Sequence, residues 1–258
     1  MKLLGYLAGL AMALGLAAPA AAQQSRLQSI IDAGVIKVGT TGDFNPMTVR
    51  NIASGEFEGF EIDAAKKLAA DLGVELEFVV TDWRSMVAGV VAGNYDIVMS
   101  GTSISEGRAK VVGYTIPYTY VGTVPLVLKS NADRFKTWND ANQPGVRVAV
   151  ILGTVFEQQA RAAFPEATIV TVEAPATAWQ EVLAGRADVT ITSNVDAASI
   201  MQRFDAITVF EDGEIRARRP LAYITQQGDF TFINFLNSWL ELNLAAGFFA
   251  DLEEKWGL

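Results

Sequence analysis

The same alternation of strand and helix patterns occurs twice along this chain, and it constrains the fold more than any other feature of the sequence. In the first half, an apolar, β-branched run at 35–40 predicts a strand, 62–72 has the spacing of an amphipathic helix, and 74–80 returns to a strand pattern. A further helix at 82–93 and a short apolar strand at 96–99 follow. Strands separated by helices in this way build parallel β-α-β units with both faces of the sheet covered.

The second half repeats short pieces of the first. The segment 145–150 matches the opening at 34–38, and a Gly-Thr pair follows each of them. The segment 184–190 echoes 92–98, in both cases at a junction between a helix and a strand. Such junctions also recur widely in α/β folds, so the echoes by themselves leave a generic origin open. We expect two similar α/β lobes.

Capping residues predict where two of the helices begin. Asp82 is expected to cap the helix that follows it, with Trp83 and Met86 on the apolar stripe of that helix. In the second half, Thr177 and Gln180 fit a capping box, in which the threonine hydroxyl accepts a backbone N–H of the first turn.

Two extended segments are expected to cross between the lobes. The segment 117–125 is β-branched and bracketed by prolines, which suits a crossing strand better than a flexible linker, and 216–221 is its counterpart on the return. We therefore predict an α/β fold of two lobes, each a mostly parallel sheet flanked by helices. The first lobe comprises 23–120 and 217–258, the second comprises 121–216, and the hinge crossings lie near 120–124 and 216–221.

The N-terminal segment 1–22 has the pattern of a cleavable secretory signal. Lys2 precedes an uncharged run rich in Leu and Ala, and an Ala-x-Ala site precedes Gln23. Cleavage is expected after Ala22 or two residues earlier; the alternative is an uncleaved anchor, although the run is shorter than the ~20 residues of a membrane span. No later apolar run is long enough to cross a bilayer, so we expect an exported, periplasmic protein without a membrane span.

The composition excludes several kinds of chemistry. The chain has no histidine and no cysteine, which removes a Ser-His-Asp triad, a Cys-His pair, a His or Cys zinc site and a disulfide scaffold. It has 29 acidic and 20 basic side chains, and the net charge of −9 argues against a nucleic-acid partner because phosphate binding needs a basic face. Calcium-loop and nucleotide-loop motifs are absent from the sequence, so we expect no metal and no cofactor.

Polar and aromatic side chains gather at the carboxyl ends of the predicted strands and at helix starts, where α/β sheets bind their ligands. A guanidinium beside the backbone N–H groups of a helix start makes an anion site, and the fork of Arg108 suits a carboxylate. The sequence therefore predicts a cleft that binds a small acid. The candidate ligand-binding residues are Asp43, Phe44, Trp83, Ser100, Gly101, Ser103, Arg108, Thr154, Ser193 and Asp196.

Several of these candidates also have an ordinary structural explanation. Arg108 can pair with Glu106 on the surface, and Trp83 can be a core residue because aromatic side chains dominate core packing. Ser103 can be a helix N-cap, and Asp196 can be a carboxylate stabilised by the dipole of a helix start. Position along the chain leaves these alternatives open.

Several segments resemble the periplasmic amino-acid-type solute-binding proteins of family 3, and the resemblance covers essentially the whole mature chain. These segments are 34–40, 55–68, 103–108 with 114–118, and 185–188. Within that superfamily the chain is most similar to the exported cyclohexadienyl dehydratases, which convert prephenate or arogenate to phenylpyruvate or phenylalanine. The segments of this second similarity are 24–27, 39–44, Trp83 and 143–146. The resemblance implies the two-lobed periplasmic-binding-protein fold of type II and two functions on that fold.

The resemblance also implies roles for individual residues. Arg108 would hold the ligand carboxylate, helped by Ser103, the Gly101 backbone and the Thr154 amide. The residues that would line the wall of the first lobe are Asp43 and Trp83.

Two positions after the strand predicted at 188–192 distinguish the two functions. Where the amino-acid binders carry an Asp that receives the ligand ammonium, this chain has Ser193. Where the dehydratases carry a Glu as general acid, it has Asp196, one methylene shorter. Phe44 stands in place of a dehydratase Tyr, and 150–154 in place of a longer Asn-Pro-Gly-Gly-Thr segment.

The incomplete dehydratase set favours a non-catalytic binding protein. The expected function is capture of a small carboxylate ligand, an amino acid or a related organic acid, by hinge closure for an ABC-type importer. Its partner would be a permease in the inner membrane. The alternative is an exported cyclohexadienyl dehydratase with Asp196 as its general acid, and a third possibility is a soluble sensor that hands its ligand to a receptor.

Overall fold

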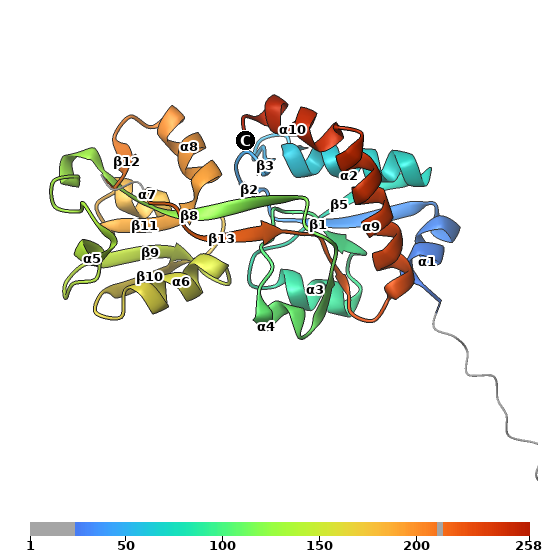
Figure 1. Cartoon of the computed structure of the whole chain (residues 1–258), viewed down its shortest axis with the longest axis horizontal. Coiled ribbons are helices and arrows are strands. Elements are labelled where there is room, and N and C mark those ends of the chain that lie inside the picture. Colours follow the sequence, from blue (N-terminus) through green and yellow to red (C-terminus); the bar gives the residue numbers. More distant parts are fainter. Residues whose placement is uncertain (1–23, 211–213) are drawn as a thin grey trace, which may run out of the picture.

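The computed structural model describes residues 24–210 and 214–258, which form two α/β lobes side by side (Figure 1). The predicted secretory signal at 1–22 lies outside the described residues. Within the described part of the chain, none of the helices has both the length and the apolar character needed to cross a bilayer. The predicted two-lobed α/β fold is confirmed.

A mixed five-stranded sheet forms the centre of the first lobe. Its strands, in spatial order, are β5 (Glu75–Val80), β1 (Val35–Thr40), β6 (Ile97–Val98), β14 (Ile224–Gln226) and β7 (Val112–Tyr114). β1 pairs in parallel with β5 and β6, whereas β14 runs antiparallel to β6 and β7. Ile36 and Val38 of β1 are fully buried, as expected for a central strand covered on both faces. The helices of this lobe are α1 (Arg26–Ala33), α2 (Phe60–Leu72), α3 (Met86–Ala92), α4 (Glu106–Ala109), α9 (Phe230–Ala245) and α10 (Phe248–Trp256).

The second lobe repeats this plan with a six-stranded sheet. Its strands are β10 (Thr168–Val172), β9 (Arg147–Ile151), β11 (Val189–Ser193), β8 (Thr119–Leu128) and β12 (Ile207–Val209) in spatial order, with β13 (Arg216–Leu221) also paired to β8. β9 is parallel to β10 and β11, and β8 is antiparallel to its three neighbours. The helices are α5 (Trp138–Ala141), α6 (Val155–Ala163), α7 (Ala178–Leu183) and α8 (Asn194–Arg203). Each lobe thus has a parallel group of three strands, extended by antiparallel strands.

Each lobe has its own hydrophobic core. In the first lobe, Phe60 of α2 packs with Phe232 of α9 and Phe249 of α10, so the C-terminal helices complete a core that begins near the N-terminus (Figure 1). In the second lobe, one cluster includes Phe135 and Phe164, and another covers the opposite face of the sheet. Two separate cores allow the lobes to move relative to each other without loss of internal packing.

The two crossing segments pair with each other as antiparallel strands. Thr119 and Tyr120 of β8 face Leu221 and Pro220 of β13, and an isolated bridge from Leu221 to Ser103 joins this ribbon to the first lobe. Figure 1 shows β8 and β13 running together through the junction between the lobes. The exact boundaries predicted for the lobes stay a prediction.

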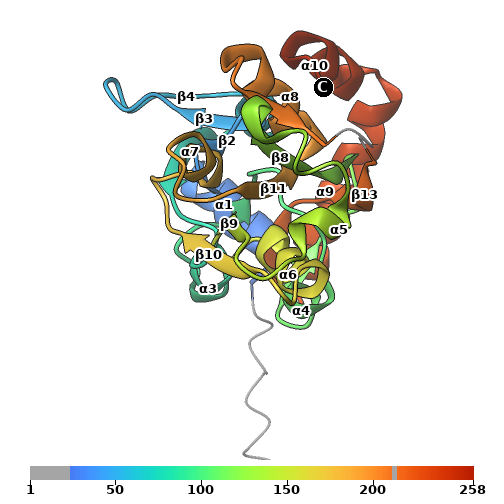
Figure 2. The ribbon, with the colours of Figure 1, turned by 90° about the vertical axis from the view of Figure 1, so that its left-hand side faces the viewer.

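A small antiparallel sheet that the sequence analysis did not anticipate follows β1. It consists of β2 (Asp43–Phe44), β3 (Thr48–Arg50) and β4 (Phe57–Glu58), and Figure 2 shows it projecting at the edge of the first lobe. Because β2 begins at Asp43, this sheet determines where the Asp43 side chain lies.

Helix α3 begins later than predicted. The carboxylate of Asp82 accepts the N–H groups of Arg84 and Ser85, at 2.8 and 2.9 Å, and so closes a turn before the helix, which starts at Met86. This local competition between a side chain and the helix is typical of aspartate. Trp83 consequently lies in the turn and not on the apolar stripe of the helix.

Candidate functional site: a cavity between the lobes

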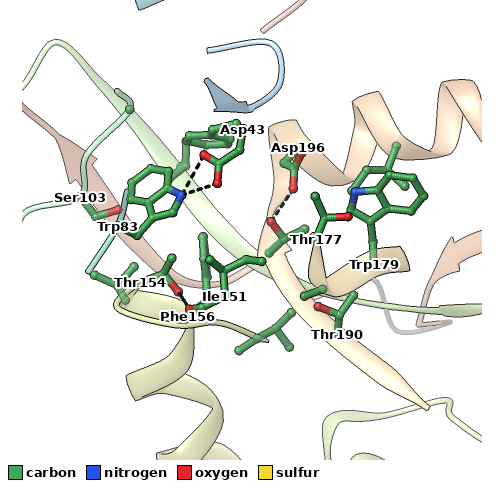
Figure 3. Close-up of a pocket in the computed structure, with 18 of the residues that line it drawn as sticks. Asp43, Trp83, Ser103, Ile151, Thr154, Phe156, Thr177, Trp179, Thr190 and Asp196 are labelled. Atoms are coloured by element: carbon green, nitrogen blue, oxygen red, sulfur yellow. Dashed lines mark hydrogen bonds between the residues drawn. The ribbon is translucent and has the colours of Figure 1, made fainter. Parts of the chain in front are cut away.

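Eight of the ten predicted site residues line one cavity between the lobes (Figure 3). They are Asp43, Phe44, Trp83, Gly101, Ser103 and Arg108 from the first lobe and Thr154 and Asp196 from the second. The cavity has a volume of about 70 Å³ and adjoins a wider groove of about 1130 Å³ that shares Asp43, Thr177, Trp179 and Asp196 with it. A space of this size suits a small solute and not a polymer.

Two predicted site residues do not reach the cavity. Ser100 is 1 % exposed, and its Oγ accepts the backbone N–H of Thr41 at 3.0 Å. Ser193 is completely buried, and its Oγ accepts the N–H of Asp196 at 3.1 Å as the N-cap of α8. Neither hydroxyl lines this cavity, because both are used to hold the backbone after a strand. Their contact with a ligand stays a prediction.

Arg108 lies in the cavity wall with no carboxylate partner. One guanidinium nitrogen donates to the carbonyl of Gly153 in the other lobe at 2.9 Å, and among residues 24–210 and 214–258 no acidic side chain forms an ion pair with it. The expected alternative, a pair with Glu106, is therefore absent from the described residues. Burial lowers the pKa of Arg108, although a guanidinium stays protonated at any pH at which proteins fold. The cavity thus contains a positive charge that an anionic ligand can neutralise.

Asp43 and Trp83 form a rigid pair on the first-lobe wall. The indole Nε1–H donates to both carboxylate oxygens of Asp43, at 2.9 and 3.0 Å, and the ring meets Phe44 edge-on with centroids 6.1 Å apart (Figure 3). Burial raises the pKa of Asp43, while hydrogen bonds from Thr41 and Trp83 oppose this rise. Trp83 also packs against the first-lobe core, so it serves both structure and site.

A buried carboxyl holds the loop that carries Gly101. The N–H of Gly101 donates to Oε1 of Glu61 at 2.7 Å, and the hydroxyl of Tyr118 donates to the same oxygen. Glu61 is fully buried, and this burial raises its pKa to about 7. The expectation that the Gly101 N–H helps to hold a ligand carboxylate is wrong, because Glu61 already occupies that donor.

Asp196 projects into the cavity from the first turn of α8, opposite Asp43 (Figure 3). Its Oδ2 accepts the hydroxyl of Thr192 at 2.7 Å. Burial raises the pKa of Asp196 to about 7, although the hydrogen bond from Thr192 and the charge of Arg203 oppose this rise; the charge of Asp43 adds the smallest upward effect. A substantial fraction of Asp196 therefore carries a proton at neutral pH, as a general acid requires.

Ser103 and Thr154 differ in how their hydroxyls are used. Ser103 is not a helix cap; its Oγ has no hydrogen-bond partner in the part of the chain that the structure describes, and Ser105 caps α4 instead. Thr154 caps α6: its Oγ1 accepts the N–H of Glu157 at 3.3 Å and donates to the carbonyl of Ile151 at 2.7 Å. The Thr154 N–H makes only a long 3.4 Å contact with that carbonyl, so it remains a donor for an anion.

The lobes touch each other above the cavity. At Gly153 (φ +81°) a Cβ atom would lie 2.7 Å from the Cα of Arg84 in the other lobe, so only glycine permits this approach. Arg84 also pairs with Glu173 at 3.1 Å, with both side chains 64 % exposed. The structure therefore represents a closed arrangement of the lobes.

Several cavity residues were missed by the sequence analysis. Thr177, Trp179 and Thr190 line the second-lobe side of the cavity (Figure 3). The capping box predicted for Thr177 is wrong, because its side chain makes no cap hydrogen bond to α7. The alternation of apolar and hydroxyl side chains along β11 (Val189–Ser193) could have indicated Thr190. Nothing in the local sequence indicates that the Thr177 hydroxyl does not cap its helix.

The donor set of the site offers no metal-binding cluster. Within the described residues, no group of three or more His, Cys, Asp or Glu side chains is arranged to hold an ion. The functional groups of the cavity are one guanidinium, two carboxyls and several hydroxyls, which are suited to bind a small polar molecule.

Comparison with known proteins identifies the family. Residues 36–258 match the bacterial extracellular solute-binding proteins, family 3. The chain belongs to this family. Its extracellular character agrees with the expected export, and the predicted resemblance is confirmed.

Members of family 3 with different activities are similar to this chain. The cyclohexadienyl dehydratase of Pseudomonas aeruginosa is 32 % identical over 91 % of this chain and 87 % of that protein. A probable amino-acid ABC transporter-binding protein of Haemophilus influenzae is 28 % identical over 85 % of this chain and 83 % of that protein. The crystal structure of the ancestral amino acid-binding protein AncCDT-1, a precursor of cyclohexadienyl dehydratase, matches with a TM-score of 0.84 and 40 % identity, over 90 % of this chain and 99 % of that one. Both functions that the sequence suggested are thus represented among the proteins similar to this chain.

Proposed function

We propose that this protein is a periplasmic binding protein that captures a small carboxylate ligand, an amino acid or a related organic acid, between its lobes. The ligand would then pass to the permease of an ABC-type importer in the inner membrane. The amino-acid transporter-binding protein of Haemophilus influenzae and the ancestral amino acid-binding protein support this assignment.

The observation that carries the proposal is the Arg108 guanidinium in the cavity wall, which forms no ion pair with an acidic side chain of the described residues. A charge taken out of water needs a partner, and a planar guanidinium matches a carboxylate with two parallel hydrogen bonds. The free hydroxyl of Ser103 and the weakly bonded N–H of Thr154 lie on the same cavity and can complete the anion site. A ligand carboxylate would replace the Gly153 carbonyl as the partner of Arg108.

The ligand would also carry a positively charged group. Asp43 and Asp196 face the cavity from opposite lobes, and each has its pKa raised by burial. An ammonium placed between them would donate hydrogen bonds to both carboxyls and balance the charge of one of them. The two carboxyls would together take the role that an Asp in place of Ser193 has in the amino-acid binders. This arrangement favours an α-amino acid over a simple organic acid.

Capture would occur by rotation of the lobes about β8 and β13. These two strands connect lobes that have separate cores, and Gly153 permits the close approach of the lobes. Because the anion site combines Arg108 from one lobe with Thr154 from the other, the ligand itself would hold the lobes together.

A thermal-shift screen of the purified mature protein tests the proposal. The panel is the twenty L-amino acids and common organic acids, each at 1 mM, followed by small-angle X-ray scattering with the best ligand. We expect a higher melting temperature with at least one amino acid and a smaller radius of gyration on binding. A panel without any stabilising carboxylate contradicts the proposed function.

A second candidate function is cyclohexadienyl dehydratase, favoured by one observation. Asp196 lines the cavity with a pKa of about 7 and can donate a proton to a departing hydroxyl, which leaves as water while the ring loses carbon dioxide and becomes aromatic. Phenylpyruvate formation from prephenate at neutral pH tests it, beside an Asp196→Asn variant and a blank without protein. Turnover that the variant lacks establishes the enzyme, whereas a rate equal to the blank excludes it.

A further inference from the structure

We propose that Thr177 and Thr190 form a second polar subsite, in the second lobe, that hydrogen-bonds the uncharged polar tip of the ligand, such as an amide or a hydroxyl. This inference rests on the proposed function, because it concerns the end of the ligand opposite the carboxylate. Figure 3 shows both threonines on the second-lobe side of the cavity, away from Trp83.

Thr190 contributes a buried hydroxyl without a partner. The residue is 1 % exposed on β11 and belongs to the lining of the cavity, and its Oγ1 is buried with no hydrogen bond to any residue that the structure describes. Two residues further along the same face of the strand, the hydroxyl of Thr192 does have a partner, Asp196. A buried hydroxyl that lacks a partner destabilises the protein, so a ligand group that hydrogen-bonds the Thr190 hydroxyl would gain affinity.

Thr177 contributes a second hydroxyl that has no partner among the described residues. It lies at the N-cap of α7, where a threonine hydroxyl normally accepts a hydrogen bond from the helix. Threonine at an N-cap usually accepts an N–H of the first helical turn. At the start of α7 this bond is not made, and the Thr177 Oγ1 is also buried with no partner within the described residues. Both hydroxyls belong to the lining of the same cavity. The sequence pattern predicts that Thr177 caps α7, but the structure does not use its hydroxyl as a cap. A departure of this kind from a local rule indicates a functional role for Thr177.

The surroundings of the two hydroxyls indicate the kind of group that binds. Besides Thr192 and Asp196, which are hydrogen-bonded to each other, the lining residues of the second lobe include apolar and aromatic side chains: Ile151, Phe156, Ala178, Trp179 and Ile200. A hydroxyl can both donate and accept, which matches an amide or a hydroxyl, whereas a full charge buried against hydroxyls and hydrocarbon carries a large desolvation cost. The ligand is thus expected to have a short apolar stem and an uncharged polar end.

Matched pairs of ligands test the subsite by isothermal titration calorimetry. The pairs are L-asparagine with L-leucine, L-threonine with L-valine, and L-glutamine with L-norleucine, whose members have similar shapes and differ in the polar tip. For wild-type protein we expect the polar member of at least one pair to bind about 5- to 100-fold more tightly. Tighter binding of L-lysine or L-glutamate than of every polar neutral ligand would overturn the assignment of an uncharged tip.

Variants then assign the preference to the two hydroxyls. Thr190→Val and Thr177→Val should reduce the preference of that pair to about threefold or less, while Thr190→Ser, which keeps the hydroxyl, should preserve it. Thr168→Val, on the exposed edge strand β10, is the matched control and should change nothing.

The outcomes separate this inference from the proposed function. Unchanged discrimination in both valine variants, with tight binding retained, overturns the subsite alone and indicates that ordered water satisfies the two hydroxyls. Failure of every member of the three pairs and of the charged amino acids to bind the wild-type protein contradicts the proposed function, and the subsite with it.

Discussion

The two walls of the cavity differ in how their polar groups are used. On the first-lobe wall, the Asp43 carboxylate accepts from Trp83, and the Gly101 N–H donates to Glu61. On the second-lobe wall, the hydroxyls of Thr177 and Thr190 have no partner in the described residues. We infer that the Asp43–Trp83 pair and the Gly101 loop of the first wall are organised before a ligand arrives, while the two threonines of the second wall would be completed by the ligand.

This difference suggests a division of labour between the lobes. A preorganised wall binds the carboxylate that all candidate ligands share with little loss of side-chain entropy. Arg108 belongs to that wall. A wall whose hydroxyls lack partners distinguishes ligands, because a ligand without a matching polar group leaves the hydroxyls of Thr177 and Thr190 without a hydrogen bond.

Closure of the two walls should be most sensitive to Gly153. In Gly153→Ala, the new Cβ would lie 2.7 Å from the Cα of Arg84, so we expect the affinity for the best amino acid of the screen to fall at least about tenfold, measured by calorimetry. Gly145→Ala is the matched control: it has nearly the same positive φ (+85°) but no atom within 4 Å of the added Cβ. Equal losses in the two variants would contradict a closed ligand-bound state.

The preorganised wall should depend on the indole of Trp83. In Trp83→Phe the Asp43 carboxylate loses both indole contacts, so we expect roughly a 3- to 10-fold loss of affinity and a further rise in the pKa of Asp43. Trp256→Phe removes a chemically identical bond, from Nε1 to Asp63 at 3.0 Å, far from the cavity. An affinity loss of similar size in that control would show that the Trp83 effect is not specific to the wall.

Stability should respond to pH through Asp196. Its pKa is about 7 in the folded protein and near 3.8 in the unfolded chain, so between these values the folded state binds more protons and the free energy of unfolding falls as pH rises. Asp196→Asn removes this penalty. We expect the variant to be more stable than wild type at pH 8 by on the order of 2 kcal/mol, half of what the full shift would give, and nearly equal to it at pH 4.

Urea denaturation at the two pH values measures this difference. Glu61, whose pKa is also about 7, contributes the same trend to both proteins and cancels in the comparison. A variant that is less stable than wild type at pH 8 would contradict the placement of a buried, protonated carboxyl at position 196.

The exposed contact between the lobes should matter least. Arg84 and Glu173 are both 64 % exposed, and such pairs contribute about 0–1 kcal/mol. Arg84→Ala is expected to change ligand affinity less than about threefold in calorimetry at 0.05 and at 0.5 M salt. A larger, salt-sensitive loss would mean that surface charges, and not the ligand, hold the lobes together.

The fold could be predicted from the sequence because its signals are local. The strands at 35–40 and 147–151 and the helix that ends before Gly73 follow from periodicity and breakers within a few residues. The small sheet β2–β4 was missed because its strands have only two or three residues, too few to show alternation. Short elements depend on contacts that are distant in the sequence.

The sequence predicted where the site lies, but not which of its hydroxyl groups cap a helix and which face the cavity. Carboxyl ends of strands meet at one edge of a sheet, which is why Asp43, Arg108 and Asp196 were brought to one cavity. Which hydroxyl caps a helix and which faces the cavity depends on rotamers and tertiary packing. Ser193 was expected in the site but caps α8, while Thr177 was expected to cap α7 but faces the cavity.

Calorimetric titration of Arg108→Ala with the amino acid that gives the largest thermal shift tests the central claim most directly. Arg84→Ala serves as the control for loss of an arginine near the same cavity. Removing the buried charge that pairs with the ligand carboxylate should weaken binding at least about 30-fold, with an unchanged circular dichroism spectrum. An affinity within threefold of wild type would show that Arg108 does not hold the ligand and would contradict the account.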